Sequence, residues 1–193
     1  MLINFIETHG PKRFEWIEPT PGSYAEQRNR LNAELGFLLP RYQIIKGFGP
    51  VDDLRVLCRQ IGVFVKFGNT SWVNFSFFPG FVTDLASVPK SFRSVVDNDE
   101  HALLPAVLCH DFLFSTHAFP FRYTNRLFHQ MSTCNGYSRF KAAVAWLAVS
   151  SPWGRKAWHA NKQRRRQWTL QTAMMQLPRP FTIDGILYRG TDR

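Results

Sequence analysis

Cysteine is scarce in this chain, and its arrangement excludes a common kind of site. Only Cys58, Cys109 and Cys134 occur among 193 residues. Their number is odd, their spacing is wide, and no Cys-x-x-Cys pair is present that could hold zinc or carry out redox chemistry. We therefore expect three reduced and mostly buried thiols.

Long apolar runs are also lacking. The longest, residues 142–149, is much shorter than the roughly 20 residues that cross a bilayer. Residues 1–16 have neither the basic nor the apolar region of a signal peptide. Internal repeats and low-complexity tracts are absent too. These absences predict no membrane span, synthesis in the cytoplasm and one domain over residues 1–193.

Apolar and aromatic side chains are plentiful. Hydrophobic residues make up 45% of the chain and aromatic residues 15%, with eighteen Phe and six Trp. A disordered chain carries far fewer. A domain of this length buries a core without disulfides or metal ions.

Positive charge exceeds negative charge, with a formal net charge of +10 and a pI of about 10.0. Part of the excess lies in a predicted basic helix over residues 155–168, with Trp158 and Trp168 interleaved and Trp153 just before it. Such a helix can bind nucleic acid through phosphate contacts and base stacking. Alternatively, its basic side chains are solvated and its Trp residues anchor it to the core, which is the interpretation we favour. The basic residues are Arg155, Lys156, Lys162, Arg164, Arg165 and Arg166.

Hydrophobic periodicity predicts an α+β fold. Residues 1–40 form an N-terminal extension with one helix over 23–38, where Ser23 and Glu26 make a capping box. A small, mostly antiparallel sheet follows within about residues 41–82. Its strands are expected at 42–45, 61–67 and 71–78, with a hairpin turn at 68–70. Three to four packed helices then extend to about residue 177, and residues 178–193 form a turn-rich tail.

The first chemical motif is Gly-Phe-Val-Thr-Asp-Leu-Ala-Ser-Val-Pro at residues 80–89. A strand ends here and a helix begins, so that Thr83, Asp84 and Ser87 stand at an open edge of the sheet. Such residues most often satisfy free N–H groups at a helix start. They are also candidates for a functional site.

The second motif sets His110 and Asp111 into the apolar helix predicted at residues 105–114. Burying a carboxylate there costs several kcal/mol unless it is paired, hydrogen-bonded or bound to metal. Asp111 therefore needs a partner. On the next predicted helix a polar stripe at spacings of three and four residues is the candidate partner. Its members are Arg122, Asn125, Arg126 and His129.

These motifs, followed by Arg-x-x-Asn-x-x-Phe at residues 122–128, resemble domain of unknown function 1353, a family of small phage and prophage proteins. The resemblance covers about residues 80–158 and includes the Trp146 helix and the Trp153-Gly154 corner. It implies a phage-encoded protein made in the host cytoplasm. The family has Tyr where this chain has Phe112 and Phe114. It has Ala-Asp where this chain has Thr124-Asn125.

A hydrolase is the first functional hypothesis. His110 serves as general base or metal ligand, and Asp84 or Asp111 orients it or binds the cation. A divalent metal is then the implied cofactor, held by His110 with Asp84 and either Asp111 or His129. Adjacent residues on a helix diverge, which disfavours joint chelation by His110 and Asp111. In a less favoured variant Ser87 is the nucleophile, although no Gly-x-Ser-x-Gly elbow surrounds it.

Two non-catalytic hypotheses stand beside it. In one, the chain is a virion structural or assembly protein whose polar cluster only ties the helices to the sheet, and its partners are other virion proteins. In the other, it is a nucleic-acid-binding accessory protein that uses the basic segment. The two departures from the family pattern favour the structural hypothesis, because each loses a polar or ionisable group. The polar residues that remain in an apolar setting favour the hydrolase.

Overall fold

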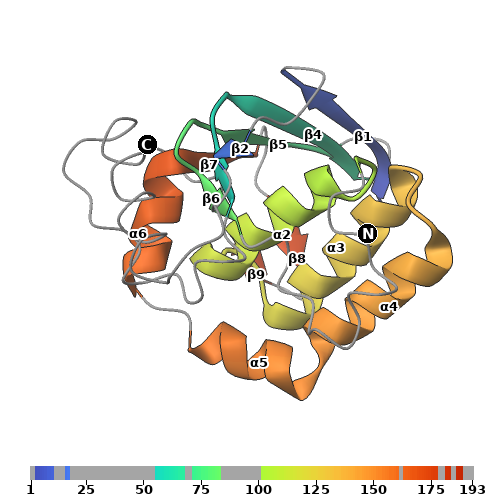
Figure 1. Cartoon of the computed structure of the whole chain (residues 1–193). Coiled ribbons are helices and arrows are strands. Elements are labelled where there is room, and N and C mark those ends of the chain that lie inside the picture. Colours follow the sequence, from blue (N-terminus) through green and yellow to red (C-terminus); the bar gives the residue numbers. More distant parts are fainter. Residues whose placement is uncertain are drawn as a thin grey trace.

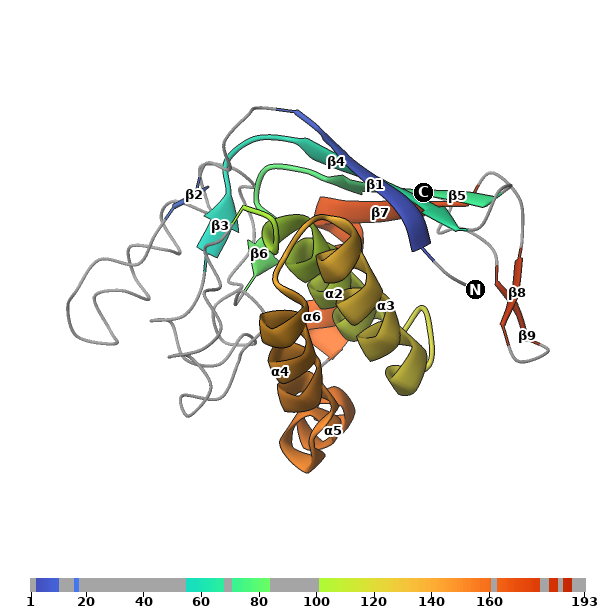
Figure 2. The ribbon, with the colours of Figure 1, turned by 90° about the vertical axis from the view of Figure 1, so that its right-hand side faces the viewer.

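The computed structural model describes residues 3–10, 16–17, 55–67, 71–83, 101–160, 163–177, 181–183 and 186–188. Within these ranges a curved four-stranded sheet lies over five helices (Figure 1). Figure 2 shows the helices on one side of this sheet, with α4 and α5 farthest from it. The α+β class predicted from the sequence is confirmed.

The main sheet is antiparallel throughout and joins distant parts of the chain. The β4–β5 hairpin was expected, and Phe67 pairs with Ser71 across its turn. The two outer strands come from outside the expected range of residues 41–82. In order across the sheet, the strands are β1 (Ile3–His9), β4 (Ile61–Phe67), β5 (Ser71–Phe77) and β7 (Ala173–Gln176).

Two smaller sheets accompany the main one. The first matters for the candidate site, because its third strand ends at Thr83. It consists of β2 (Trp16–Ile17), β3 (Arg55–Leu57) and β6 (Val82–Thr83), in that order. The second is a hairpin of β8 (Phe181–Ile183) and β9 (Ile186–Tyr188).

Five helices are present in the described ranges, where three to four were expected. The helix over 23–38 and the strand over 42–45 lie outside these ranges. The basic segment 155–168 was wrongly interpreted as one helix, since it contributes to two. The helices are α2 (Leu104–Thr116), α3 (Phe121–Cys134), α4 (Arg139–Ser150), α5 (Pro152–His159) and α6 (Gln163–Thr172).

The end of α5 explains this division of the basic segment. The Ala160 amide donates to the Lys156 carbonyl and closes the last turn. The side chain of Trp158, one residue before the end of α5, is buried. Packing of this indole thus orients a helix that is too short to be stable alone.

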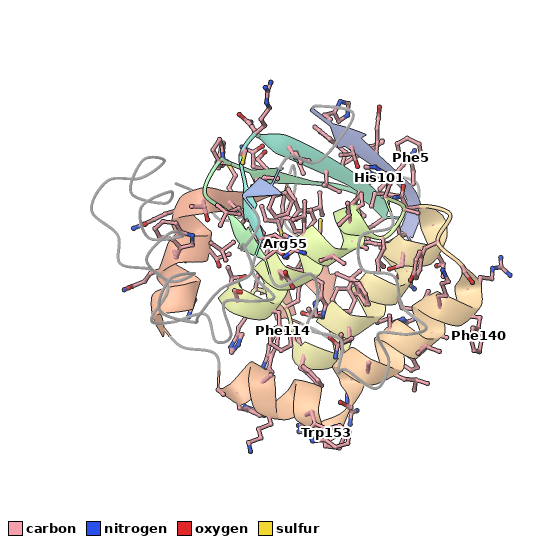
Figure 3. All side chains as sticks on the ribbon, in the orientation of Figure 1. Phe5, Arg55, His101, Phe114, Phe140 and Trp153 are labelled. Carbon is pink, nitrogen blue, oxygen red and sulfur yellow. The ribbon has the colours of Figure 1, made fainter. Side chains whose placement is uncertain are left out.

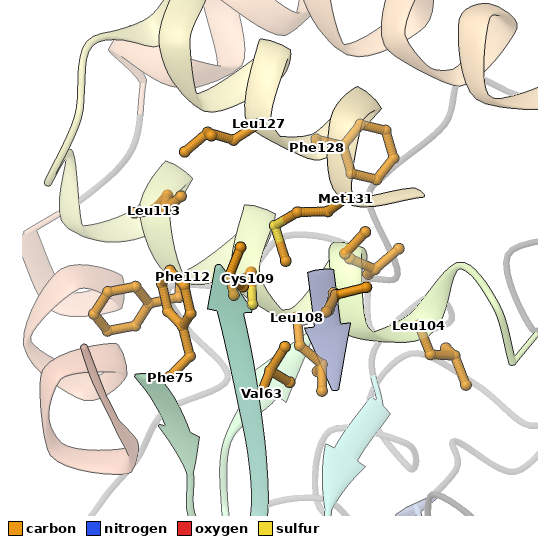
Figure 4. Close-up of a cluster of buried hydrophobic side chains, with 14 of the residues drawn as sticks. Val63, Phe75, Leu104, Leu108, Cys109, Phe112, Leu113, Leu127, Phe128 and Met131 are labelled. Carbon is orange, nitrogen blue, oxygen red and sulfur yellow. The ribbon is translucent and has the colours of Figure 1, made fainter. Parts of the chain in front are cut away.

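Helix α2 occupies the centre of the molecule because it is apolar on every side. All its residues except Phe114 are buried. Figure 4 shows this helix between the sheet, represented by Val63 and Phe75, and the buried face of α3. The Phe112 and Phe75 rings meet edge to face with their centroids 5.9 Å apart.

Each cysteine is a free thiol, as expected, but only one is buried. Cys109 lies in the core, Cys58 is half-buried and Cys134 is exposed. Burial raises the pKa of the Cys109 thiol well above its ordinary value, so this residue is a core side chain and not a nucleophile. No helix in the described part of the chain has the length and apolar character needed to cross a membrane.

His117 lies where the end of α2 meets α5. It ends α2 in the left-handed conformation, with φ of 54°. Its ring stacks on Trp158, with the centroids 4.0 Å apart. The loss of water around this ring lowers the pKa of His117 below its ordinary value of 6.5. The pKa of His129 is lowered for the same reason.

Stability should therefore fall as the pH drops below about 6.5, because the unfolded chain then binds more protons than the folded chain. We expect the melting temperature to decrease between about pH 7.5 and about pH 5.5. The variant His117→Asn, which tolerates the left-handed conformation, should show a smaller decrease. His101→Asn, at an exposed position, is the control. Equal decreases in wild type and His117→Asn would contradict the assignment to His117.

Candidate functional site

The buried carboxylate of α2 has a partner on the small sheet. The hydroxyl of Thr83, at the end of β6, donates a hydrogen bond to Oδ2 of Asp111. Both side chains are buried. This contact joins the first sequence motif to the second and supplies the partner that a carboxylate in an apolar helix requires.

The adjacent histidine connects to α3. His110 Nε2 and Asn125 Oδ1 are hydrogen-bonded at 2.9 Å, so that Nε2 carries the proton and donates to the amide oxygen. Asn125 Nδ2 in turn donates to the Val149 carbonyl at 3.3 Å. Val149 belongs to the last turn of α4. One amide side chain thus links α2, α3 and α4.

The remaining ring nitrogen of His110 lies in an apolar setting. The Phe114 and Phe128 rings have their centroids 5.4 Å and 4.9 Å from that of His110. Nδ1 lies 3.8 Å from Oδ1 of Asp111, beyond hydrogen-bond distance, and no described residue hydrogen-bonds to it. His110 and Asp111 therefore interact weakly with each other, and each is held by a different element.

A close backbone contact lies beside this linkage. Gly154, in the first turn of α5, approaches Val149 so closely that a Cβ atom would lie 2.7 Å from the Val149 carbonyl carbon. The Gly154 amide also donates to the capping hydroxyl of Ser151 at 3.3 Å. The Trp153-Gly154 corner thus brings α5 against the carbonyl that accepts from Asn125.

The glycine that opens the first motif also has a backbone role. Gly80 has φ of 91°, a conformation that glycine adopts without strain. Its amide donates to the Leu57 carbonyl at 2.8 Å. Its carbonyl accepts from the Trp168 indole at 3.0 Å. The turn before β6 is thereby joined to α6.

Burial limits the chemistry available to this cluster. The exposed fraction is 0% for Thr83, 1% for Asn125, and 4% for both His110 and Asp111. A general base must come within hydrogen-bond reach of the proton that it removes. Within the described residues, Thr83 instead bonds to Asp111, His110 to Asn125, and Asn125 to a backbone carbonyl. The arrangement is suited to fixing α2, α3, α4 and β6 in one relative position.

The other candidate residues do not all join the cluster. Asp84 and Ser87 lie outside the described residues. The predicted polar stripe on α3 divides, because Asn125 faces inward whereas Arg122 and Arg126 are exposed. His129 is half-buried, with its ring 5.8 Å from the Trp146 ring centroid. It lines a separate pocket of about 390 Å³ with Gln130 and Cys134, among other residues.

The described residues hold no group of three or more His, Cys, Asp or Glu side chains placed to bind one metal ion. Asp84, a member of the proposed donor set, is not among them. Asn125 occupies the place where the family pattern has Asp. Its amide nitrogen donates to the Val149 carbonyl, a contact that an ionised carboxylate cannot make.

The basic residues are placed on two helices. Arg155 and Lys156 of α5 and Arg166 of α6 are exposed. Lys162 and the side chains of Arg164 and Arg165 lie outside the described part. Trp158 and Trp168 are buried, so they anchor the helices and present no face to a nucleic-acid base. Trp153 is exposed.

Sequence reasoning missed two parts of the site. One is the Val149 carbonyl, a backbone atom that no side-chain pattern reveals. The other is Trp168, whose contact with Gly80 spans 88 residues. The Trp153-Gly154 corner is part of the family resemblance. It directly follows Ser151-Pro152, a pattern typical of a helix start. This combination was the sequence signal for the corner.

Comparison with known proteins agrees with the motif resemblance. Neither a curated protein nor a solved structure matches the chain significantly. Residues 65–149 match the model of a family described as protein of unknown function, DUF1353. This match contains Thr83, His110, Asp111, Asn125 and Val149, the residues of the buried cluster. Over residues 65–149 the chain is thus similar to the DUF1353 family of proteins of unknown function.

Proposed function

We propose that this chain is a non-catalytic structural or assembly protein of a phage particle, and that it binds an acidic protein partner through α4 and α5. The observation that carries the proposal is the exposed apolar surface of these two helices. Phe140 on α4 and Trp153 on α5 are each 71% exposed. Both side chains project away from the body of the molecule (Figure 3).

The exposed residues of α4 follow one helical face. Phe140 and Leu147 are seven residues apart, and half-buried Val144 lies between them. This spacing places all three on one stripe. The opposite side of α4, with Ala142, Ala145 and Val149, is buried. The helix is therefore apolar on both sides, which marks the outer side as an interaction surface.

The charge of the helical half specifies the kind of partner. Residues 101–172 contain ten Lys and Arg but a single acidic residue, the buried Asp111. Four of these basic residues, Arg139, Lys141, Arg155 and Lys156, belong to α4 and α5. A partner of these helices thus meets positive charge, which favours an acidic rim on the partner. A helical stripe of Phe, Val and Leu complements an apolar protein groove better than it complements a nucleic acid. The basic residues are Arg122, Arg126, Arg139, Lys141, Arg155, Lys156, Lys162, Arg164, Arg165 and Arg166.

The buried cluster supports a non-catalytic role. Its hydrogen bonds connect helices and sheet, and its histidine is almost inaccessible. A hydrolase would require His110 or Asp111 to reach substrate or water. The resemblance to phage and prophage proteins supports a virion or an assembly intermediate as the setting.

Particles and assembly intermediates purified from host cells that carry the gene should contain the chain. A carbodiimide, which joins amines to carboxylates without a spacer, should link Lys141 or Lys156 to an Asp or Glu of a partner protein. We expect Leu147→Asp to remove the chain from the particles, because it places a charge in the apolar stripe. Mass spectrometry of the particles measures both results.

Phe5→Asp is the matched control, since Phe5 is an exposed apolar residue of the main sheet. It should leave incorporation unchanged. Circular dichroism of each variant checks that the fold is kept. Absence of the wild-type chain from both particles and intermediates would refute the proposal. Recovery of the chain bound to nucleic acid, with an affinity that falls as salt rises, would also refute it.

A further inference from the structure

The less buried face of the main sheet, to which Phe64 of β4 belongs, carries a groove of about 520 Å³. Four side chains from four strands cross it in one row. Glu7 pairs with Phe64, Phe64 with Asn74, and Asn74 with Gln176. Because alternate residues of a strand point to the same face, this row is set by the strand register.

The polar groups of the groove are amides, a carboxylate and an imidazole. Asn74 Nδ2 donates to Gln176 Oε1 at 3.3 Å. Asn74 Oδ1 accepts no hydrogen bond from the described residues, although it is shielded from water. Glu7 Oε2 lies 3.5 Å from His9 Nε2. A ligand with several hydroxyl groups can both donate to these oxygens and accept from the nitrogens.

Trp72, which is 38% exposed, also lines the groove. Phe5 meets its ring edge to face, with the centroids 6.1 Å apart. Lys66 Nζ lies 5.2 Å from the centroid of the same ring. These contacts hold an exposed indole in place beside the amide row. A fixed aromatic surface next to convergent polar groups is typical of a ligand site.

The charge of the lining decides between ligand classes. Among the described residues that line the groove there is no Lys or Arg, and Glu7 is the carboxylate. A neighbouring cation, the Lys66 ammonium, is engaged with the Trp72 ring. Nucleic acids and other phosphate-bearing ligands require cations at the contact, and a carboxylate repels them. A neutral ligand meets no such repulsion. Hydroxyl groups suit the amides and the carboxylate, and an apolar C–H face suits the indole.

We propose that this groove binds a neutral saccharide, with one sugar ring stacked on Trp72 and its hydroxyl groups bonded to Asn74, Gln176 and Glu7. The helices lie on one side of the sheet (Figure 2), whereas the groove is lined by sheet residues such as Phe64, which alternate with the buried ones. The saccharide site is therefore independent of the α4 and α5 surface, and a partner protein can occupy that surface at the same time.

Isothermal titration of the full chain with chitotriose, mannotriose and maltotriose tests the site. At least one of these neutral trisaccharides should bind with a Kd of about 1 mM or lower. Its affinity should be insensitive to salt, since no phosphate contact is made. Trp72→Ala and Asn74→Ala should each weaken binding about tenfold or more.

Trp146→Ala is the matched control, because Trp146 is a 37% exposed indole on α4. It should bind the trisaccharide as wild type does. Failure of all three trisaccharides to bind saturably would overturn the proposal, and so would binding that persists in Trp72→Ala. Competition by a short oligothymidylate with salt-dependent affinity would assign the groove to nucleic acid instead. None of these binding results bears on incorporation of the chain into particles through Leu147. The saccharide proposal and the protein-partner proposal can therefore fail independently of each other.

Discussion

Gly154→Ala is expected to lower the free energy of unfolding by about 3 kcal/mol, since the added methyl group overlaps the backbone of Val149. Alanine normally stabilises a helix relative to glycine, by about 1 kcal/mol, so the expected sign is the reverse of the usual one. The obstacle is the main chain of α4, which cannot rotate away as a side chain can. The first turn of α5 must therefore shift.

Equilibrium denaturation followed by circular dichroism measures this loss. Gly62→Ala is a suitable control, because a Cβ atom there meets only ordinary contacts, at 3.6 Å and beyond. Its free energy of unfolding should change by less than about 1 kcal/mol. A Gly154→Ala protein as stable as wild type would show that α5 tolerates displacement from α4. The close approach would then have no structural role.

Asn125→Ala should cost about 3 to 4 kcal/mol, because it removes two hydrogen bonds and leaves two buried groups without partners. These groups are His110 Nε2 and the Val149 carbonyl. Asn125→Asp is the informative companion, since it introduces the carboxylate that the motif resemblance implies at this position. It keeps an acceptor for His110 but, when ionised, cannot donate to Val149. We expect it to be destabilised as well.

The control for both variants is Arg122→Ala, one turn earlier on α3 at an exposed position. Its stability should stay within about 0.5 kcal/mol of wild type. Denaturation at neutral pH is again the measurement. If Asn125→Ala unfolded like wild type, the cluster would not be the tie between the helices. The case for a structural role would then be lost.

The departures from the family pattern fit this structural role. Phe112 is fully buried and packs against Phe75. Phe114 lies between the rings of His110 and Trp158, with centroids 5.4 Å and 5.1 Å from its own. A tyrosine at either position would bring a hydroxyl that needs a partner when buried. In this chain both aromatic rings serve packing alone.

Much of the fold could be predicted from local patterns. Alternating burial along residues 61–67 and the apolar character of 105–114 follow from spacing and residue type. Strands β1 and β7 could not be predicted in this way. The residues of β7, Ala-Met-Met-Gln, include no β-branched side chain, and β7 is a strand because it pairs with the edge of β5.

Residues 80–129 show the same difference between what local sequence patterns predict and what tertiary packing decides. Its sequence alone determined that Asp111 lies in an apolar helix and requires a partner, because the cost of burying a carboxylate follows from residue type. Only the tertiary structure decided that the partner is Thr83 and that Asn125 bonds to His110 and Val149. Periodicity is a property of neighbouring residues, whereas these pairings depend on how distant segments pack.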